Sequence, residues 1–139
     1  MNELELFRGA GRYYVLKGHE VVAVDAQVWA QRFEIAERRV AHYQGAGIEV
    51  STVFLGLDHR HGGGGPPLVF ETMVFGGPMD ESQWRWATWD EAERGHGKAL
   101  SLALKSSPMR FLLAHLGIRY SSRRAERWLR RIKQTFRHA

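Results

Sequence analysis

The segment Leu68–Phe75 constrains the fold more than any other part of the chain. Glu71 and Thr72 are the polar residues among its eight positions, and the rest are aliphatic, aromatic or Met. Pro66-Pro67 precede the segment and Gly76-Gly77-Pro78 follow it, and both groups interrupt regular structure. An apolar run of this length is typical of a strand covered on both faces. We therefore expect the central strand of a sheet here.

Other short runs of β-branched and aromatic residues predict further strands around this one. Gly18 lies between the first two runs and predicts a hairpin, and Gly45-Ala46-Gly47 separate the next two. The last run follows the central strand closely and predicts a strand at the edge of the sheet. The expected strands are Arg12–Leu16, Val21–Val24, Arg39–Tyr43, Ile48–Leu55 and Trp84–Ala87.

Two helices are expected to cover this sheet. Asp25 has the side chain of an N-cap, and apolar residues recur behind it at spacings of three and four, which predicts a helix over Ala26–Glu37. Thr88 with Glu91 three residues later has the form of a capping box, which predicts a helix from Trp89 to about Leu104. The expected fold class is α+β, with a mostly antiparallel sheet of five or six strands.

The charge of the chain is divided very unevenly between a body and a C-terminal extension. Residues 1–104 hold ten Lys and Arg and fourteen Asp and Glu, for a net charge of −4, whereas residues 105–139 hold ten basic residues and one acidic residue, for +9. Pro108, Gly117 and the serines after it predict two short helices in this basic extension. The second helix has an apolar stripe formed by Ala125, Trp128, Leu129, Ile132 and Phe136. Because of this stripe, we expect the extension to dock on the body or on a partner.

Composition excludes several classes of function. The chain has no cysteine, which excludes disulfides, thiolate catalysis and cysteine-ligated zinc. The first ten residues are interrupted by charges and do not resemble a signal peptide, and no apolar run has the length that a membrane span requires. We expect a protein of the bacterial cytoplasm that does not bind membranes. The oligomeric state is left open.

A group of histidines and carboxylates is the candidate for chemistry. Asp58, His59, Glu71 and His96 form the candidate polar cluster, and His59, His61, His96 and Glu71 would be the ligands if a divalent metal were bound. Their spacing matches no known zinc signature, so we predict no cofactor, with a divalent metal as the alternative. In the structural interpretation, Asp58 caps its loop instead. No catalytic residue is assigned.

Glu71 requires a partner whichever interpretation holds. A carboxylate on a covered strand loses its hydration, and this is costly unless a cation or hydrogen-bond donor compensates. From the sequence we expect Arg39, His59 or His96 to be that partner.

Two further groups of residues bear on whether the chain binds nucleotides, nucleic acid or protein. Gly62–Gly65 lack the Lys-Ser/Thr of a phosphate-binding loop and lead into prolines, which argues against nucleotide binding. The tryptophans Trp84, Trp86 and Trp89 could stack on bases or contact a protein, or they could pack in the core. Because they are so close together, we expect at least one at the surface.

The basic extension has three interpretations. It could contact nucleic acid phosphates, it could place its apolar stripe in a groove of a partner, or it could fold back onto the acidic body. The sequence does not choose among them. The residues that would contact a macromolecule are Arg123, Arg124, Arg127, Trp128, Arg130, Arg131 and Lys133.

Three stretches of sequence resemble a family of uncharacterised proteins of tailed phages and bacterial prophages. They are Val50–His59, Pro66–Gly77 and Ala87–Ala92 with Gly95-His96, and weaker similarity extends the resemblance over about residues 12–100. The resemblance implies a phage or prophage origin but brings no activity with it. The basic extension departs from the shorter members of that family.

These observations predict a protein that acts by binding. The expected function is that of a phage or prophage accessory protein that engages a host or viral macromolecule without catalysis, and inhibition of host defence is one such role. The expected partner is a host or phage protein. Two alternatives are a small metal-dependent enzyme that uses the candidate polar cluster, and a DNA-binding protein that uses the basic C-terminal helix.

Overall fold

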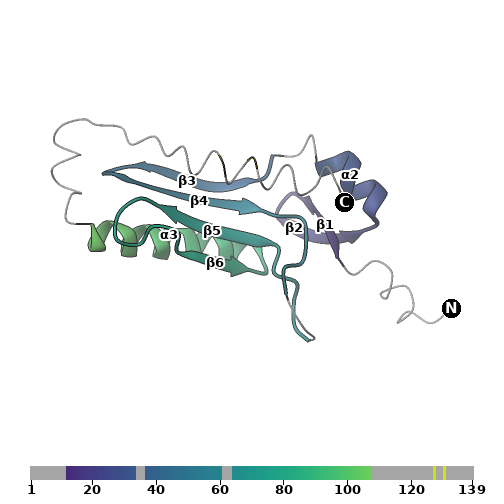
Figure 1. Cartoon of the computed structure of the whole chain (residues 1–139). Coiled ribbons are helices and arrows are strands. Elements are labelled where there is room, and N and C mark those ends of the chain that lie inside the picture. Colours follow the sequence, from purple (N-terminus) through teal and green to yellow (C-terminus); the bar gives the residue numbers. More distant parts are fainter. Residues whose placement is uncertain (1–11, 34–36, 61–63, 108–126, 128–129, 131–139) are drawn as a thin grey trace.

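The computed structural model describes residues 12–33, 37–60, 64–107, 127 and 130 of the 139-residue chain. Six strands and two helices lie in this part of the chain, which confirms the α+β class (Figure 1). Their order is β1 (Tyr13–Lys17), β2 (Glu20–Val24), α2 (Ala26–Phe33), β3 (Arg39–Gly45), β4 (Ile48–Phe54), β5 (Phe70–Phe75), β6 (Gln83–Trp86) and α3 (Trp89–Ser106).

The strands form two sheets rather than the single sheet of five or six strands expected from the sequence. β1 and β2 pair as a hairpin, and β3, β4, β5 and β6 form a separate antiparallel sheet in that order. The hairpin joins the segment that leaves β4: Tyr14 N donates to Gly56 O at 2.9 Å, and Tyr13 forms an isolated bridge with Leu57. Gly56 has a φ of 72°, a conformation that glycine adopts readily, and the chain departs from the sheet there. The hairpin therefore does not extend the larger sheet.

β4 and β5 form the centre of the four-stranded sheet. Every residue of β4 is buried, and so are five of the six residues of β5, which confirms Leu68–Phe75 as the region of an interior strand. The turn between β3 and β4 is made by Ala46 and Gly47, with φ values of 51° and 77°. Positive φ at both central positions is the requirement of a tight type I′ hairpin turn.

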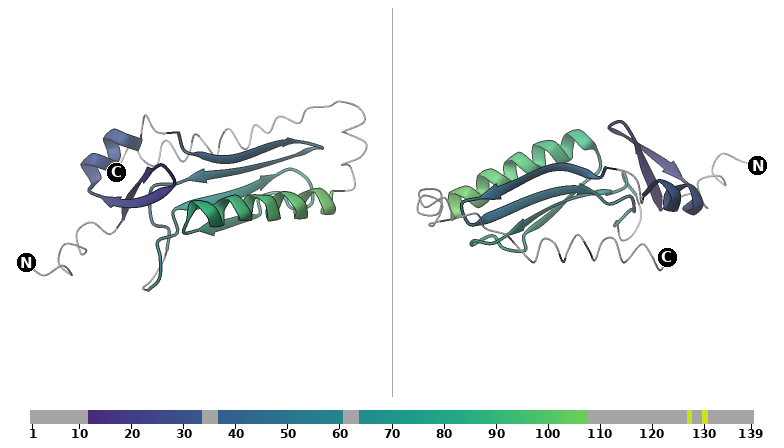
Figure 2. Two further views of the ribbon diagram at one scale, coloured as in Figure 1. Left: turned by 180° about the vertical axis from the view of Figure 1, so that it is seen from behind. Right: turned by 90° about the horizontal axis from the view of Figure 1, so that it is seen from above.

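α3 packs along one face of this sheet, as both views in Figure 2 show. The expected capping box is present, because Glu91 N donates to Thr88 Oγ1 and the Glu91 carboxylate accepts from Thr88 N. Small residues of the helix face the strands: Ala99 and Ala103 contact a core with Ile48, Val50 and Val74, and Ala92 contacts Phe54 and Phe70. Such small side chains let the helix backbone approach the sheet closely.

α2 covers the hairpin and not the four-stranded sheet. This corrects the expectation that both helices cover one sheet. Asp25 caps it as predicted, because Val28 N donates to Asp25 Oδ1 at 2.8 Å. Trp29 and Phe33 are buried against Val15 of β1. β1, β2 and α2 thus form a unit with a small core of its own, which we call the hairpin unit (residues 13–33). Glu37, expected as the last helical residue, lies outside the helix.

The C-terminal extension falls almost entirely outside the described residues. Residues 105–107, which include the end of α3, are described, and so are Arg127 and Arg130, both of them helical and exposed. The proposed division into a body and a two-helix extension therefore stays a prediction. Neither α2 nor α3 has the length and apolar character that crossing a bilayer requires.

Candidate functional site

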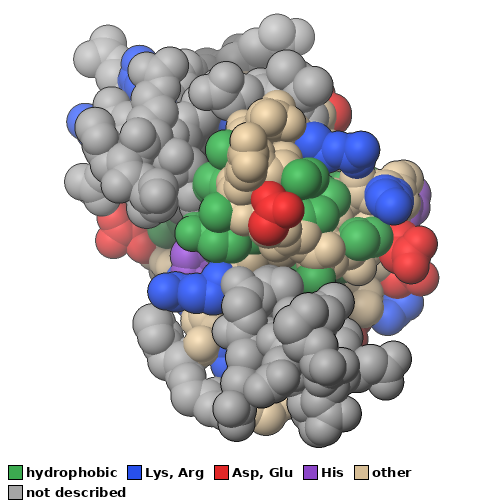
Figure 3. Space-filling model, turned by 90° about the vertical axis from the view of Figure 1, so that its right-hand side faces the viewer, with side chains coloured by type: hydrophobic (Ala, Val, Ile, Leu, Met, Phe, Trp, Pro, Cys, Tyr) green, Lys and Arg blue, Asp and Glu red, His purple; other side chains and the backbone are tan. Residues whose placement is uncertain are grey.

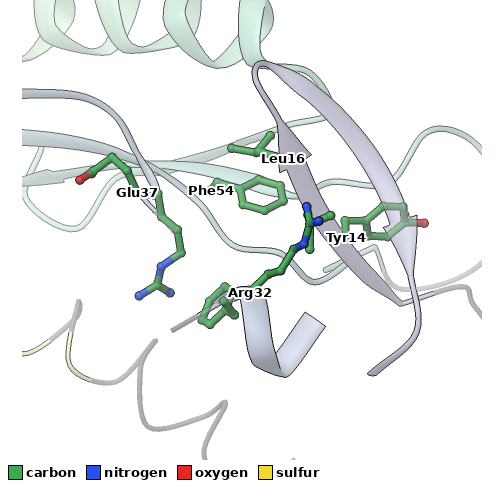
Figure 4. Close-up of a pocket in the computed structure, with 8 residues that line it drawn as sticks. Tyr14, Leu16, Arg32, Glu37 and Phe54 are labelled. Atoms are coloured by element: carbon green, nitrogen blue, oxygen red, sulfur yellow. The ribbon is translucent and has the colours of Figure 1, made fainter. Parts of the chain in front are cut away.

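A cleft lies where the hairpin unit meets the four-stranded sheet (Figure 4). Its volume is about 420 Å³, within the range usual for ligand pockets. The walls come from β1, from α2, from the segment that leads into β3 and from the end of β4. We call it the arginine cleft, and its lining residues are Tyr14, Val15, Leu16, Arg32, Phe33, Glu37, Arg38 and Phe54.

Arg38 is the most constrained basic group of the arginine cleft. Its backbone carbonyl accepts from Phe54 N at 2.8 Å, which ties the segment before β3 to the end of β4. Its guanidinium carbon lies 3.9 Å from the centroid of the Phe33 ring, an arrangement that is favourable for a cation over an aromatic face. Burial lowers the pKa of Arg38, and the nearby Glu37 carboxylate opposes that shift to a smaller extent. The guanidinium stays charged while losing part of its hydration.

The carboxylate in the cleft wall does not neutralise these arginines by direct contact. Glu37 Oε1 accepts from Arg39 N at 3.2 Å, and Figure 4 shows the Glu37 carboxylate directed away from Arg32. His42–Glu49 and Glu71–Arg85 are ion pairs between described residues, and neither Arg32 nor Arg38 forms one with another described residue. Neither guanidinium is therefore neutralised by a carboxylate of the described residues.

The other walls of the arginine cleft are aromatic and aliphatic. Tyr14, Leu16 and Phe54 line the cleft together with Arg32 (Figure 4). Figure 3 faces the end of the molecule that carries the hairpin unit and shows hydrophobic side chains at the surface beside Lys and Arg side chains. A cleft with apolar walls and two guanidinium forks suits an anionic group attached to a flat apolar body.

His96 belongs to a separate, buried network beneath α3. Its Nδ1 lies 2.9 Å from Thr52 Oγ1, which is 2.7 Å from Thr72 Oγ1, and the Trp86 indole N–H donates to Thr72 Oγ1 at 2.9 Å. Both hydroxyl protons find acceptors within the network if Thr72 donates to Thr52 and Thr52 donates to His96 Nδ1. That arrangement places the proton of a neutral imidazole on Nε2. Burial lowers the pKa of His96, and His42 adds a smaller effect in the same direction.

The stability of the protein should therefore fall at mildly acidic pH. In the unfolded chain His96 takes up a proton near its ordinary pKa of 6.5, whereas the folded protein takes it up at lower pH. Between those values the unfolded state binds more protons than the folded state. The contribution of His96 to the free energy of unfolding is therefore complete above about pH 7 and decreases as the pH falls below that value. Urea denaturation from pH 7.5 to pH 5 should show this decrease, and His96→Gln should reduce it. The matched control His19→Gln, at an exposed histidine, should leave it in place. An unchanged pH dependence in His96→Gln would contradict this assignment.

Glu71 is paired with Arg85, which corrects the three partners expected from the sequence. Arg85 Nε donates to Glu71 Oε2 at 3.0 Å, and Gln83 Nε2 lies 3.4 Å from the same oxygen. Glu71 and Arg85 stand directly opposite each other on β5 and β6, so the strand register creates the pair. The pairing satisfies a buried carboxylate and gives no sign of a catalytic role.

The structure does not bring the candidate polar cluster together. Thr72 joins the His96 network on the α3 side of the sheet, and its neighbour Glu71 points to the opposite face because side chains alternate along a strand. Asp58 caps its loop by accepting from Arg60 N at 2.9 Å and Leu68 N at 3.0 Å. His59 N donates to Leu68 O at 3.3 Å in the same loop.

A metal centre is not apparent in the described portion of the chain. There, no group of three or more His, Cys, Asp or Glu side chains is placed to hold an ion. His61, one of the candidate ligands, lies outside the described residues. The opposite orientations of Glu71 and His96 do not fit one shared ion.

The three tryptophans after β5, of which we expected at least one at the surface, are all half-buried. Trp84 and Trp86 pack against the cores between the sheet and α3. Trp89 stacks on His19 of the β1–β2 turn, with ring centroids 4.0 Å apart. Packing accounts for all three.

The residues expected to contact a macromolecule are described in part. Arg127 and Arg130 are exposed on a helix, whereas Arg123, Arg124, Trp128, Arg131 and Lys133 lie outside the described residues. Sequence reasoning did not identify the arginine cleft. The available signal was Arg32, which falls three residues after Trp29 within the apolar spacing of α2.

The comparisons with known proteins add no relative. No family model matches the chain, and no curated protein and no solved structure matches it significantly.

Proposed function

We propose that this chain is a binding protein without catalytic activity, and that the arginine cleft holds an anionic group of its partner. The observation that carries the proposal is a pair of guanidinium groups in a cleft with apolar walls, neither of them engaged in an ion pair among the described residues. Charge-assisted hydrogen bonds from a desolvated guanidinium are among the stronger polar interactions in proteins. The cleft therefore favours an anion over a neutral ligand of the same shape.

The partner that we propose is a host or phage protein. A volume of about 420 Å³ admits an acidic side chain together with a neighbouring aromatic or aliphatic one. The phage or prophage origin rests on the sequence resemblance, and an accessory protein that inhibits host defence is one role in keeping with it. Asp58 caps its own loop, Glu71 pairs with Arg85 and His96 bonds to Thr52, so these residues add no support to the alternative of a metal-dependent enzyme.

A small probe tests the cleft without knowledge of the partner. Phenylacetate carries a carboxylate on a flat ring, and phenylacetamide is its neutral isostere. Calorimetric titration should give a Kd on the order of 1 mM for phenylacetate, since a ligand of this size gains only a few kcal/mol. Binding of phenylacetamide should be at least about tenfold weaker, because the charge-assisted hydrogen bond is lost.

Variants assign the binding to the two arginines. Arg32→Gln and Arg38→Gln should each weaken phenylacetate binding about tenfold. Arg94→Gln, at an exposed position of α3, is the matched control and should bind as the wild type does. Equal binding of the acid and the amide, no detectable binding of phenylacetate, or full binding by both cleft variants would each contradict the proposal.

A further inference from the structure

The face of the four-stranded sheet that points away from α3 is buried. We call it the second face, and its central residues are Glu49, Ser51 and Val53 of β4 with Glu71, Met73 and Phe75 of β5. Ser51 is 0% exposed, Phe75 2%, Glu71 5% and Glu49 7%. Carboxylates on a sheet face open to water would be exposed even when paired, so this face is covered.

The described elements do not provide that cover. α3 lies on the opposite face, where His96 contacts Thr52 and the alanines of the helix contact Val50 and Val74. α2 packs on β1 within the hairpin unit. Among the described residues, no helix or strand therefore lies over the centre of the second face.

The sequence after α3 has the right length and pattern to fill this place. The chain continues for residues 108–139 beyond Ser107, which is itself buried. A helix over about sixteen residues of this segment would be about 24 Å long. The seven residues of β4 extend over about 23 Å, so the two elements match in length.

The two described residues of this segment indicate which side of it faces inward. Arg127 and Arg130 are helical and exposed. In the helix that the sequence predicts for this segment, at about 100° per residue, Arg127 and Arg130 would lie roughly half a turn from the mean direction of the apolar stripe. With these arginines exposed, such a helix would direct its apolar stripe at the protein.

We propose that residues 108–139 of the same chain dock on the second face through this apolar stripe. The segment then forms a third layer, with the sheet between it and α3. Charge favours the arrangement, because residues 108–139 carry +8 and residues 1–104 carry −4. The docked segment presents Arg127 and Arg130 outward. The inference is independent of the arginine cleft.

Engineered disulfides test the docking directly, because the chain has no cysteine of its own. Met73 is half-buried at the centre of the second face. The pairs Met73→Cys/Leu129→Cys and Met73→Cys/Ile132→Cys in the full chain should yield an intramolecular disulfide in at least one case under mild oxidation, detected by non-reducing electrophoresis and mass spectrometry. The matched control Met73→Cys/Arg130→Cys should not.

Each outcome of this experiment is decisive. Disulfide-linked dimers without the intramolecular product would assign the second face to another copy of the chain and overturn the proposal. The absence of cross-linking in both stripe pairs, or equal cross-linking in the control, would also overturn it.

A second measurement does not depend on disulfide geometry. Trp128→Ser should uncover the second face and increase the fluorescence of the dye ANS severalfold, while the circular dichroism of the sheet is retained. Arg127→Ser, one residue away on the exposed side, should leave dye binding unchanged. Equal dye binding by the wild type and both variants would contradict docking through the stripe.

Discussion

Replacing Gly95 by alanine should destabilise the protein by about 2 kcal/mol, because overpacking in a fixed environment costs more than alanine gains in a helix. A Cβ at position 95 would clash with Cζ2 of Trp86. The Trp86 ring cannot easily move aside, since its N–H donates to Thr72 Oγ1 in the buried network under α3. Chemical denaturation with a circular dichroism readout measures the effect.

Gly97 provides the matched control two residues away. It lies in the same helix, is exposed, and a Cβ there would meet nothing within 4 Å. Gly97→Ala should therefore stabilise the protein by about 0.5–1 kcal/mol, the usual gain when alanine replaces glycine in a helix. Equal effects of the two substitutions would show that Trp86 does not pack against Gly95 as described.

Replacing Arg85 by methionine should cost about 3 kcal/mol of stability, because it leaves the buried carboxylate of Glu71 without its cation. Glu71 accepts from Arg85 Nε at 3.0 Å, and its side chain is 6% exposed. Gln83, with its amide nitrogen 3.4 Å from the same oxygen, would remain as a weaker partner. Denaturation at pH 7 measures the loss.

The double variant Glu71→Leu/Arg85→Met distinguishes the cost of an unpaired buried carboxylate from the cost of altered packing. Replacing both partners of a buried ion pair by apolar residues is often close to neutral, so the double variant should recover most of the stability lost in Arg85→Met. If Arg85→Met alone cost less than about 0.5 kcal/mol, Glu71 would have to be solvated or paired elsewhere, contrary to the structure.

The parts of the fold that could be predicted from the sequence depend on neighbouring residues. Asp25 and the Thr88–Glu91 capping box define helix starts through hydrogen bonds that span a few positions. The turn between β3 and β4 follows from Ala46-Gly47, and the interior position of β5 follows from its apolar composition. Each of these signals is contained in a short stretch of chain.

The features that could not be predicted depend on contacts between distant segments. The division into two sheets depends on where the hairpin meets the chain after β4, at Gly56 and Leu57. The partner of Glu71 depends on the register of β5 and β6, which puts Arg85 opposite it. Only the fold places Arg32 and Arg38 beside Phe54. Side chains alternate along β5 and α3 packs on one face of the sheet only. Glu71 and His96 therefore lie on opposite faces.

Chemical-shift mapping tests the central claim, binding in the arginine cleft, most directly. Phenylacetate would be titrated into the isotopically labelled full chain while backbone amide and Arg side-chain signals are recorded. The proposal predicts saturable shifts concentrated at Tyr14–Leu16, Arg32, Arg38 and Phe54, absent with phenylacetamide. Shifts confined to α3 or to the C-terminal segment, with these cleft signals unchanged at saturation, would contradict it.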